Sequence, residues 1–117
     1  MGQLTTHVLD ISCGQPASEM KVEVWRRSTI EKKLLKTFYT NDDGRVDKPI
    51  LEKEELKIGT YELIFFVGDY YARQGGRLRE FLFLDLVPIR FCITSEQEHY
   101  HVPLLVAPGG YSTYRGS

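Results

Sequence analysis

Apolar and polar residues alternate along most of this chain, and this period of two constrains the fold more than any other feature. Residues 20–26 show it most clearly, because Met20, Val22 and Val24 fall on one side of an extended chain. Similar short runs, with turn residues between them, lie at residues 4–11, 34–39, 61–67, 87–94, 99–107 and 111–115. Such a series of short strands predicts an all-β fold, either a sandwich or a barrel.

One segment breaks the alternation. Asp69 can cap a helix and two glycines follow soon after, so the sequence predicts one short helix over residues 69–74. The charged stretch at residues 52–57 fits a further helical turn and a solvated loop equally well.

The size and charge of the chain narrow the class of protein. With 117 residues, 42% of them hydrophobic, residues 1–117 are expected to form a single domain with its own core. A formal net charge of −1 gives no reason to expect nucleic acid or a membrane surface as a partner. Cys13 and Cys92 are too few for a disulfide framework. No secretory signal begins the sequence, so the expected location is cytoplasmic.

The candidate chemistry centres on three histidines, His7, His99 and His101. The pattern places His7 inside the first strand, and it places His99 and His101 on one face of the strand at residues 99–107. The opposite face of that strand is more continuously apolar and is expected to face the core, with Tyr100, Val102, Leu104 and Val106. The histidines would then lie on outer faces, where ordinary solvated side chains are as good an interpretation as functional ones.

Two kinds of site can be weighed on spacing alone. His99 and His101 have a spacing that zinc can use, with His7 as a third ligand, but no cysteine or carboxylate has matching spacing. A serine nucleophile is disfavoured because the sequence has no Gly-x-Ser-x-Gly elbow. Arg45 follows a turn at residues 40–44 that ends in Gly44, a residue suited to a left-handed conformation.

Four motifs give the sequence a recognisable resemblance. They are Thr6-His7-Val8-Leu9-Asp10, Asp43-Gly44-Arg45, the run from His99 to Leu105, and the closing Tyr111-Ser112-Thr113-Tyr114-Arg115-Gly116-Ser117. In this order and spacing the chain resembles the 5-hydroxyisourate hydrolase family of transthyretin-related proteins. The hormone carrier transthyretin shares the fold but lacks the two histidines, the arginine and the terminal tetrapeptide.

The resemblance implies a transthyretin-like sandwich of two four-stranded sheets with one short helix. It also implies a homotetramer, a dimer of dimers, in which subunits pair through their last strands and a channel runs through the assembly. The outer faces that carry His7 and His101 would line this channel, and the end of the chain would reach into it.

The same resemblance assigns the site. The catalytic positions fall on His7, Arg45, His101 and Ser117. Tyr114 and Arg115 join these four in the substrate-binding set, whereas His99 is not expected to be catalytic. No metal or cofactor is implied.

The implied reaction is hydrolysis of 5-hydroxyisourate to 2-oxo-4-hydroxy-4-carboxy-5-ureidoimidazoline in urate degradation. His7 and His101 would activate water and transfer protons, with the split between them left open, and Arg45 would hold adjacent substrate oxygens. Ser117 would hold substrate or water by its hydroxyl or its carboxylate.

The alternative from another class is a transthyretin-like carrier with an apolar ligand in the same channel, which a polar lining disfavours. Some members of the family are peroxisomal, and a peroxisomal location stays open even though Arg115-Gly116-Ser117 is not a Ser-Lys-Leu-type signal.

Overall fold

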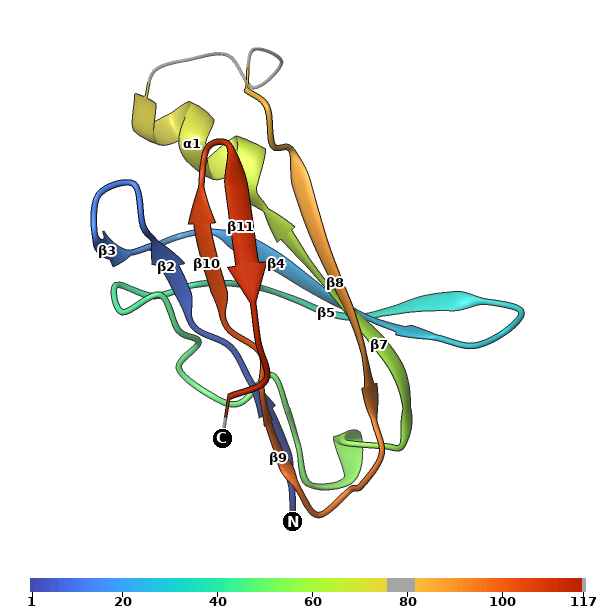
Figure 1. The fold of residues 1–117 in the computed structure, drawn as a ribbon. Coiled ribbons are helices and arrows are strands. Elements are labelled where there is room, and N and C mark those ends of the chain that lie inside the picture. The colour runs from blue at the N-terminus through green and yellow to red at the C-terminus, as the bar shows by residue number, and fades with distance from the viewer. Residues whose placement is uncertain (76–81, 117) are drawn as a thin grey trace.

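The computed structural model describes residues 1–75 and 82–116, which form two facing layers of strands with a helix at one end (Figure 1). The first layer is an antiparallel sheet in the order β5-β4-β7-β8. Its strands are β4 (Lys21–Arg27), β5 (Lys32–Tyr39), β7 (Gly59–Phe66) and β8 (Leu86–Ile93). All four were predicted from the alternation, with ends that differ by one or two residues.

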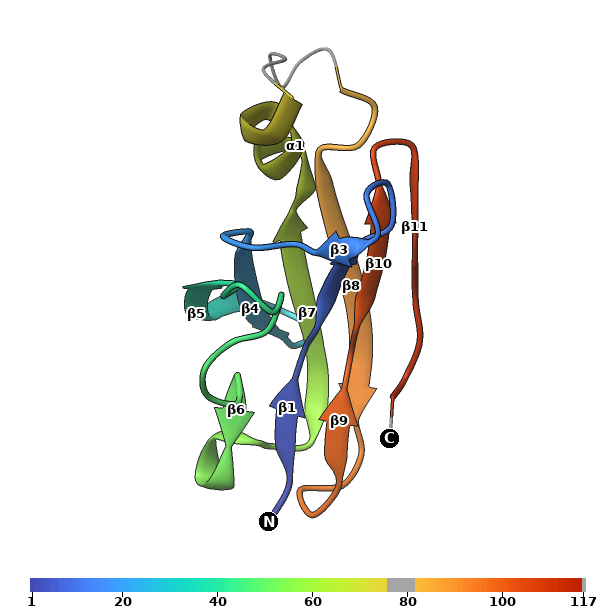
Figure 2. The same cartoon turned by 90° about the vertical axis from the view of Figure 1, so that its left-hand side faces the viewer.

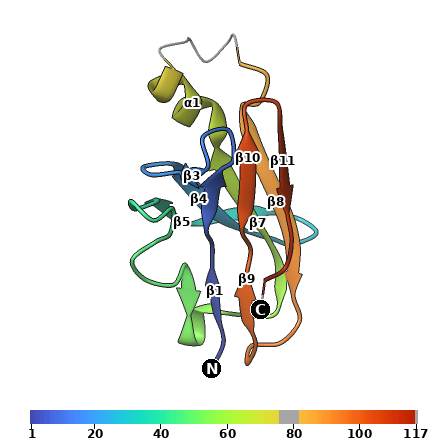
Figure 3. The same cartoon turned by 60° about the vertical axis from the view of Figure 1, so that its left-hand side comes forward.

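The second layer contains two ladders placed end to end. One is β6-β1-β9, and the other is β11-β10-β2-β3. Their strands are β1 (Gln3–Thr5), β2 (Val8–Asp10), β3 (Gln15–Pro16), β6 (Leu51–Glu52), β9 (His99–His101), β10 (Leu104–Ala107) and β11 (Gly110–Thr113). Figure 2 and Figure 3 show β1 leading into β2 and β9 leading into β10 along the same layer.

The predicted continuous strands at residues 4–11 and 99–107 are therefore wrong in one respect, because each is interrupted in the middle. Pro103 has no N–H to donate, and the Val102 carbonyl accepts a hydrogen bond from the Thr6 hydroxyl at 2.7 Å. Backbone hydrogen bonds still cross the break, from Val102 N to the Thr5 carbonyl at 2.9 Å and from Leu104 N to the His7 carbonyl at 3.0 Å. The two broken strands therefore stay side by side and parallel.

The helix α1 (Val67–Gly75) lies where one was predicted but begins two residues earlier. Asp69 is thus in the first turn and is not the cap. The earlier start follows from the apolar end of β7, which runs directly into the helix and keeps Val67 buried. Of the two readings for residues 52–57, the helical turn is present as the 3₁₀ helix η1 (Lys53–Glu55).

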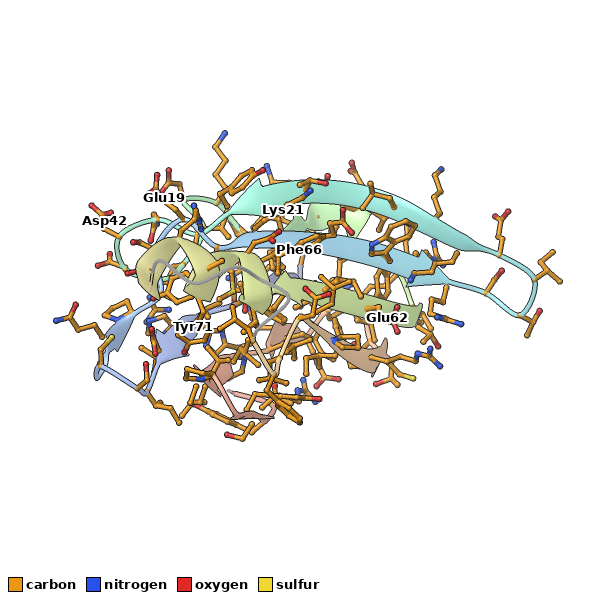
Figure 4. The ribbon with its side chains drawn as sticks, turned by 90° about the horizontal axis from the view of Figure 1, so that it is seen from above. Glu19, Lys21, Asp42, Glu62, Phe66 and Tyr71 are labelled. Atoms are coloured by element: carbon orange, nitrogen blue, oxygen red, sulfur yellow. The ribbon has the colours of Figure 1, made fainter. Side chains whose placement is uncertain are left out.

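A buried carboxylate ties α1 to the second layer. Asp10, at the end of β2, is 4% exposed and accepts hydrogen bonds from the hydroxyls of Tyr70 at 2.9 Å and Tyr71 at 2.7 Å. The Ser12 backbone N–H and hydroxyl also donate to it. Burial alone would raise the pKa of Asp10, but these four hydrogen bonds lower it, so the group is held as a carboxylate. Figure 4 shows Tyr71 pointing from α1 toward the second layer.

The core lies between the layers, on the faces that the alternation predicted. Met20, Val22 and Val24 are fully buried. The predicted core face of the residues 99–107 is also buried, with Tyr100, Val102, Leu104 and Val106 between 0% and 6% exposed.

The outer face of the first layer carries several charged side chains. Glu62 forms ion pairs with Arg27, Lys32 and Arg90 there, and Lys21 lies over the Phe66 ring at 4.6 Å (Figure 4). In the described ranges no helix combines the length and the apolar composition needed to cross a membrane.

Candidate functional site

His101 is held by two neighbours, Thr5 and Gly116. It lies on β9 opposite Thr5 of β1, and the Thr5 hydroxyl forms a hydrogen bond with His101 Nδ1 at 2.8 Å. On another side, the Gly116 N–H donates to the His101 carbonyl at 2.8 Å. A side chain at Gly116 would meet the imidazole, because its Cβ would lie 2.6 Å from His101 Cδ2. Gly116 therefore allows the chain to pass directly against the ring.

His7 lies in the break between β1 and β2, so the prediction that it is inside a strand is wrong. The neighbouring Thr6 and Val8 are 3% and 0% exposed, as the alternation predicted, and His7 is on the side away from them. Its carbonyl remains tied to Leu104 on β10. The backbone is thus fixed on both sides of His7 although the residue is outside any strand.

Arg45 is presented by a turn that Asn41 organises. The Asn41 side-chain oxygen accepts from the backbone N–H groups of Asp43 at 2.9 Å and Arg45 at 3.1 Å, which closes an Asx turn. Gly44 has a φ of 75°, the left-handed conformation that its sequence context predicted.

This turn docks on the strand that follows His7. The Val8 N–H donates to the Gly44 carbonyl at 2.8 Å, and a Cβ at Gly44 would lie 2.3 Å from the Val8 carbonyl oxygen. A side chain at Gly44 would therefore separate the Arg45 turn from His7. The glycine is needed both for its conformation and for this close approach.

Electrostatics couples His7, Arg45 and His101. Partial burial lowers the pKa of His7, and the positive charge of Arg45 lowers it further, against a hydrogen bond to the Asp43 backbone that raises it. Partial burial also lowers the pKa of His101, and the charges of Arg45 and His7 add to this effect. Both imidazoles are therefore favoured in their neutral form near neutral pH, with a guanidinium beside them.

The backbone of the C-terminal segment contacts His101, but the side chains of this segment contact other residues. The predicted strand at residues 111–115 ends at Thr113, whose hydroxyl donates to the Pro103 carbonyl, and the chain then bridges from Gly116 to His101. Ser117, a predicted catalytic residue, lies outside the described residues.

Tyr114 and Arg115 lie in a different groove from the histidines. The Arg115 guanidinium donates to Glu98 at 3.0 Å and to the His99 carbonyl at 3.3 Å, and it stacks over the Tyr100 ring at 4.4 Å. With Tyr114 it lines a groove of about 270 Å³ between the edge strands β8 and β11. Within one protomer, the structure does not bring these two side chains to His7 and His101.

His7, Arg45 and His101 form the group that we call the histidine patch; within the chain both histidines are half-buried and Arg45 is exposed. A neighbouring pocket of about 270 Å³ has Thr5, Thr6 and Arg45 in its wall, but His7 and His101 do not line it. Among residues 1–75 and 82–116, no three His, Cys, Asp or Glu side chains gather as metal ligands would. The patch offers two neutral imidazoles and one guanidinium, a set suited to proton transfer and to binding oxygen atoms.

Comparison of the sequence with known protein families identifies the family to which the chain belongs. The model of the HIUase/Transthyretin family matches residues 4–116 of the sequence. The chain belongs to this family. A 5-hydroxyisourate hydrolase of Halalkalibacterium halodurans is 55% identical over 117 residues, which cover 99% of this chain and 98% of that protein.

Solved structures agree with this assignment. The chain aligns over its full length, and over the full length of the other, with the 5-hydroxyisourate hydrolase of Klebsiella pneumoniae, at a TM-score of 0.83 and 38% identity. An (S)-allantoin synthase structure matches at a TM-score of 0.91 and 47% identity over 99% of this chain, which spans only 44% of that longer protein. Sea bream transthyretin, at 22% identity and a TM-score of 0.87 over 97% of this chain and 94% of its own, confirms the predicted transthyretin-like fold.

The sequence did not predict the contacts that Thr5, Asn41 and Gly116 make around His101 and Arg45. Thr5 meets His101 only because β1 and β9 are paired, and nothing in the local sequence predicts that pairing. Asn41 lay within the predicted turn, where its place before Asp-Asp-Gly is a signal for an Asx turn. Gly116 belonged to the terminal motif, but its contact with the His101 ring requires the fold.

Proposed function

We propose that this protein is a 5-hydroxyisourate hydrolase, which opens a cyclic amide of its substrate with water in urate degradation. The observation that carries the proposal is the docking of the Arg45 turn beside His7, through the hydrogen bond from Val8 N–H to the Gly44 carbonyl, where the charge of Arg45 acts on both His7 and His101. The full-length relatives of the chain bear that name. A carrier of apolar ligands is a poorer fit, because such a ligand would leave these polar groups without partners.

The chemistry follows from the state of the groups. A neutral imidazole removes a proton from water as its oxygen forms a bond to the amide carbon. Negative charge then develops on the carbonyl oxygen, and the Arg45 guanidinium can hold it with two parallel N–H donors. The C–N bond breaks as the ring nitrogen takes up a proton from the imidazolium. The lowered pKa values of His7 and His101 support this scheme, because they keep a base available near neutral pH.

The remaining parts of the site are proposals of the same kind. Ser117 joins His7, Arg45 and His101 as a catalytic group, and Tyr114 and Arg115 contribute to substrate binding. The supporting contact is the hydrogen bond from the Gly116 N–H to the His101 carbonyl, one residue before Ser117 in the sequence.

We also propose that residues 1–117 act as one domain in a homotetramer. The patch is open within one protomer, and the edge strands β8 and β11 border an uncovered groove where a second copy could pair. Neighbouring subunits would then enclose the histidines in a channel. The cytoplasmic location expected from the sequence stays a prediction.

A matched pair of histidine variants tests the proposal. His101→Ala is expected to lower kcat by roughly 10²- to 10⁴-fold, the usual effect of removing a positioned acid or base. His99→Ala, two residues away on the same strand, is expected to keep near wild-type activity because its side chain is exposed and outside the patch. The assay follows the ultraviolet absorbance of freshly made 5-hydroxyisourate. Equal activity in both variants would refute the role of the patch.

A further inference from the structure

Among the residues that the structure describes, the contacts on the His101 ring leave one of its two nitrogens open. The Thr5 hydroxyl occupies Nδ1 at 2.8 Å. Gly116 lies against the opposite edge, since a Cβ there would be 2.6 Å from Cδ2 and 3.2 Å from Cγ. The ring positions left are Cε1 and Nε2, so Nε2 is the nitrogen that can meet a substrate.

We propose that Thr5 is a positioning residue, which holds His101 through Nδ1 so that Nε2 acts as the base that takes a proton from water. The inference rests on the proposed hydrolase function and extends it to a residue outside the predicted site. It also divides the roles that the sequence left open, because it makes His101 the base.

The tautomer follows from the surroundings of the ring. A threonine hydroxyl can donate or accept, so by itself the contact with Nδ1 permits either tautomer. Partial burial and the positive charge of Arg45 disfavour the imidazolium, so one of the two nitrogens keeps a lone pair. We assign that lone pair to Nε2, because Nδ1 already lies at the Thr5 hydroxyl, where its N–H can donate, and Nε2 is then free to accept a proton.

The contact also survives the chemical step. As the water oxygen bonds to the amide carbon, one water proton moves to Nε2 and His101 becomes an imidazolium. Its Nδ1–H still donates to Thr5, so the ring keeps its orientation. The same proton can then pass from Nε2 to the ring nitrogen of the substrate as the C–N bond breaks, which returns His101 to its starting state.

A merely structural Thr5 would behave differently. The pairing of β1 with β9 uses backbone groups, so a valine of similar shape at residue 5 keeps the strand and loses only the hydroxyl. A packing role would change thermal stability in Thr5→Val without changing the tautomer of His101. A positioning role changes the tautomer and kcat together, and Thr5→Ser restores both.

The activity arm compares three variants. Thr5→Val is expected to lower kcat about tenfold, the effect of losing one hydrogen bond of ordinary strength, with KM within about twofold of wild type. Thr5→Ser is expected to recover most of the loss. Thr60→Val makes the same change on β7, where the hydroxyl contacts only Cys92 in the described structure, and is expected to leave kcat unchanged.

The spectroscopic arm needs no turnover. Nitrogen-15 shifts of the imidazoles, assigned to His101 by comparison with His101→Ala, are expected to show a protonated Nδ1 and a bare Nε2 above pH 7.5. In Thr5→Val the two nitrogens should move toward an averaged tautomer mixture. A wild-type His101 protonated on Nε2, or a Thr5→Val spectrum identical to wild type, overturns the inference. A protein without hydrolase activity that keeps the expected spectrum would refute the proposed function and leave the Thr5 contact standing.

Discussion

We expect Gly116→Ala, although a small change, to have a large effect on catalysis. The new Cβ would lie 2.6 Å from His101 Cδ2, about 0.8 Å short of the 3.4 Å at which ordinary contacts begin. The φ of Gly116 is outside the left-handed region, so alanine adds no backbone strain. The strain must be relieved by moving the His101 ring or the end of the chain. Because Thr5 and the Gly116 N–H hold both, the displacement falls on the reacting geometry.

A misplacement approaching 1 Å in an active site can cost on the order of 100-fold, so kcat should fall roughly 10- to 100-fold. Hydrolysis of 5-hydroxyisourate, followed by ultraviolet absorbance, measures the loss. Gly109→Ala is the matched control, because its Cβ would have no neighbour within 4 Å and its φ also permits alanine. The control should keep wild-type kcat. If Gly116→Ala is equally active, the terminal segment does not position His101 and the reasoning fails.

Four further predictions follow from the described contacts. Arg45→Lys should lower kcat/KM at least about tenfold in the same assay, because an ammonium cannot copy the two parallel donors of a guanidinium. Since the pKa values of His7 and His101 are lowered on folding, the unfolded chain binds more protons below about pH 6.5. The free energy of unfolding should therefore fall as pH drops from about 6.5 through the folded-state pKa values, and glutamine at both positions should flatten that slope in denaturant titrations. Asp10→Ala should cost about 3 kcal/mol of unfolding free energy, because the buried Tyr70 hydroxyl loses its acceptor and the Tyr71 hydroxyl keeps only the longer bond to the Val106 carbonyl. Exposed Glu54→Ala should cost under about 0.5 kcal/mol. Exhaustive chelation should leave kcat unchanged, and loss of activity with recovery on added zinc would instead support the His99-x-His101 metal site.

The strand faces could be predicted from the sequence because burial follows a period of two. The alternation placed Val22 and Val24 in the core and kept His101 on the other side of its strand from Tyr100, as the structure confirms. The left-handed turn at Gly44 was also predictable, because few residues other than glycine adopt that conformation without strain.

Contacts between distant segments could not be predicted in this way. Thr5 and His101 are 96 residues apart and meet through a parallel pairing that the alternation does not specify. The break around His7 depends on Pro103, which lies in the matching break between β9 and β10 and leaves a gap in the shared ladder. The early start of α1 likewise depends on Val67, whose burial against the core outweighs the capping preference of Asp69. The local pattern thus predicted which face of each strand is buried, whereas the contacts within the site depend on how distant strands pair.

The measurement that tests the central claim most directly is the decay of freshly generated 5-hydroxyisourate with and without the wild-type protein. The absorbance should decay faster than the spontaneous reaction, at a rate proportional to the protein concentration. The acceleration should be lost in the His7→Ala, His101→Ala double variant at equal concentration. Decay at the spontaneous rate with folded wild-type protein would contradict the account.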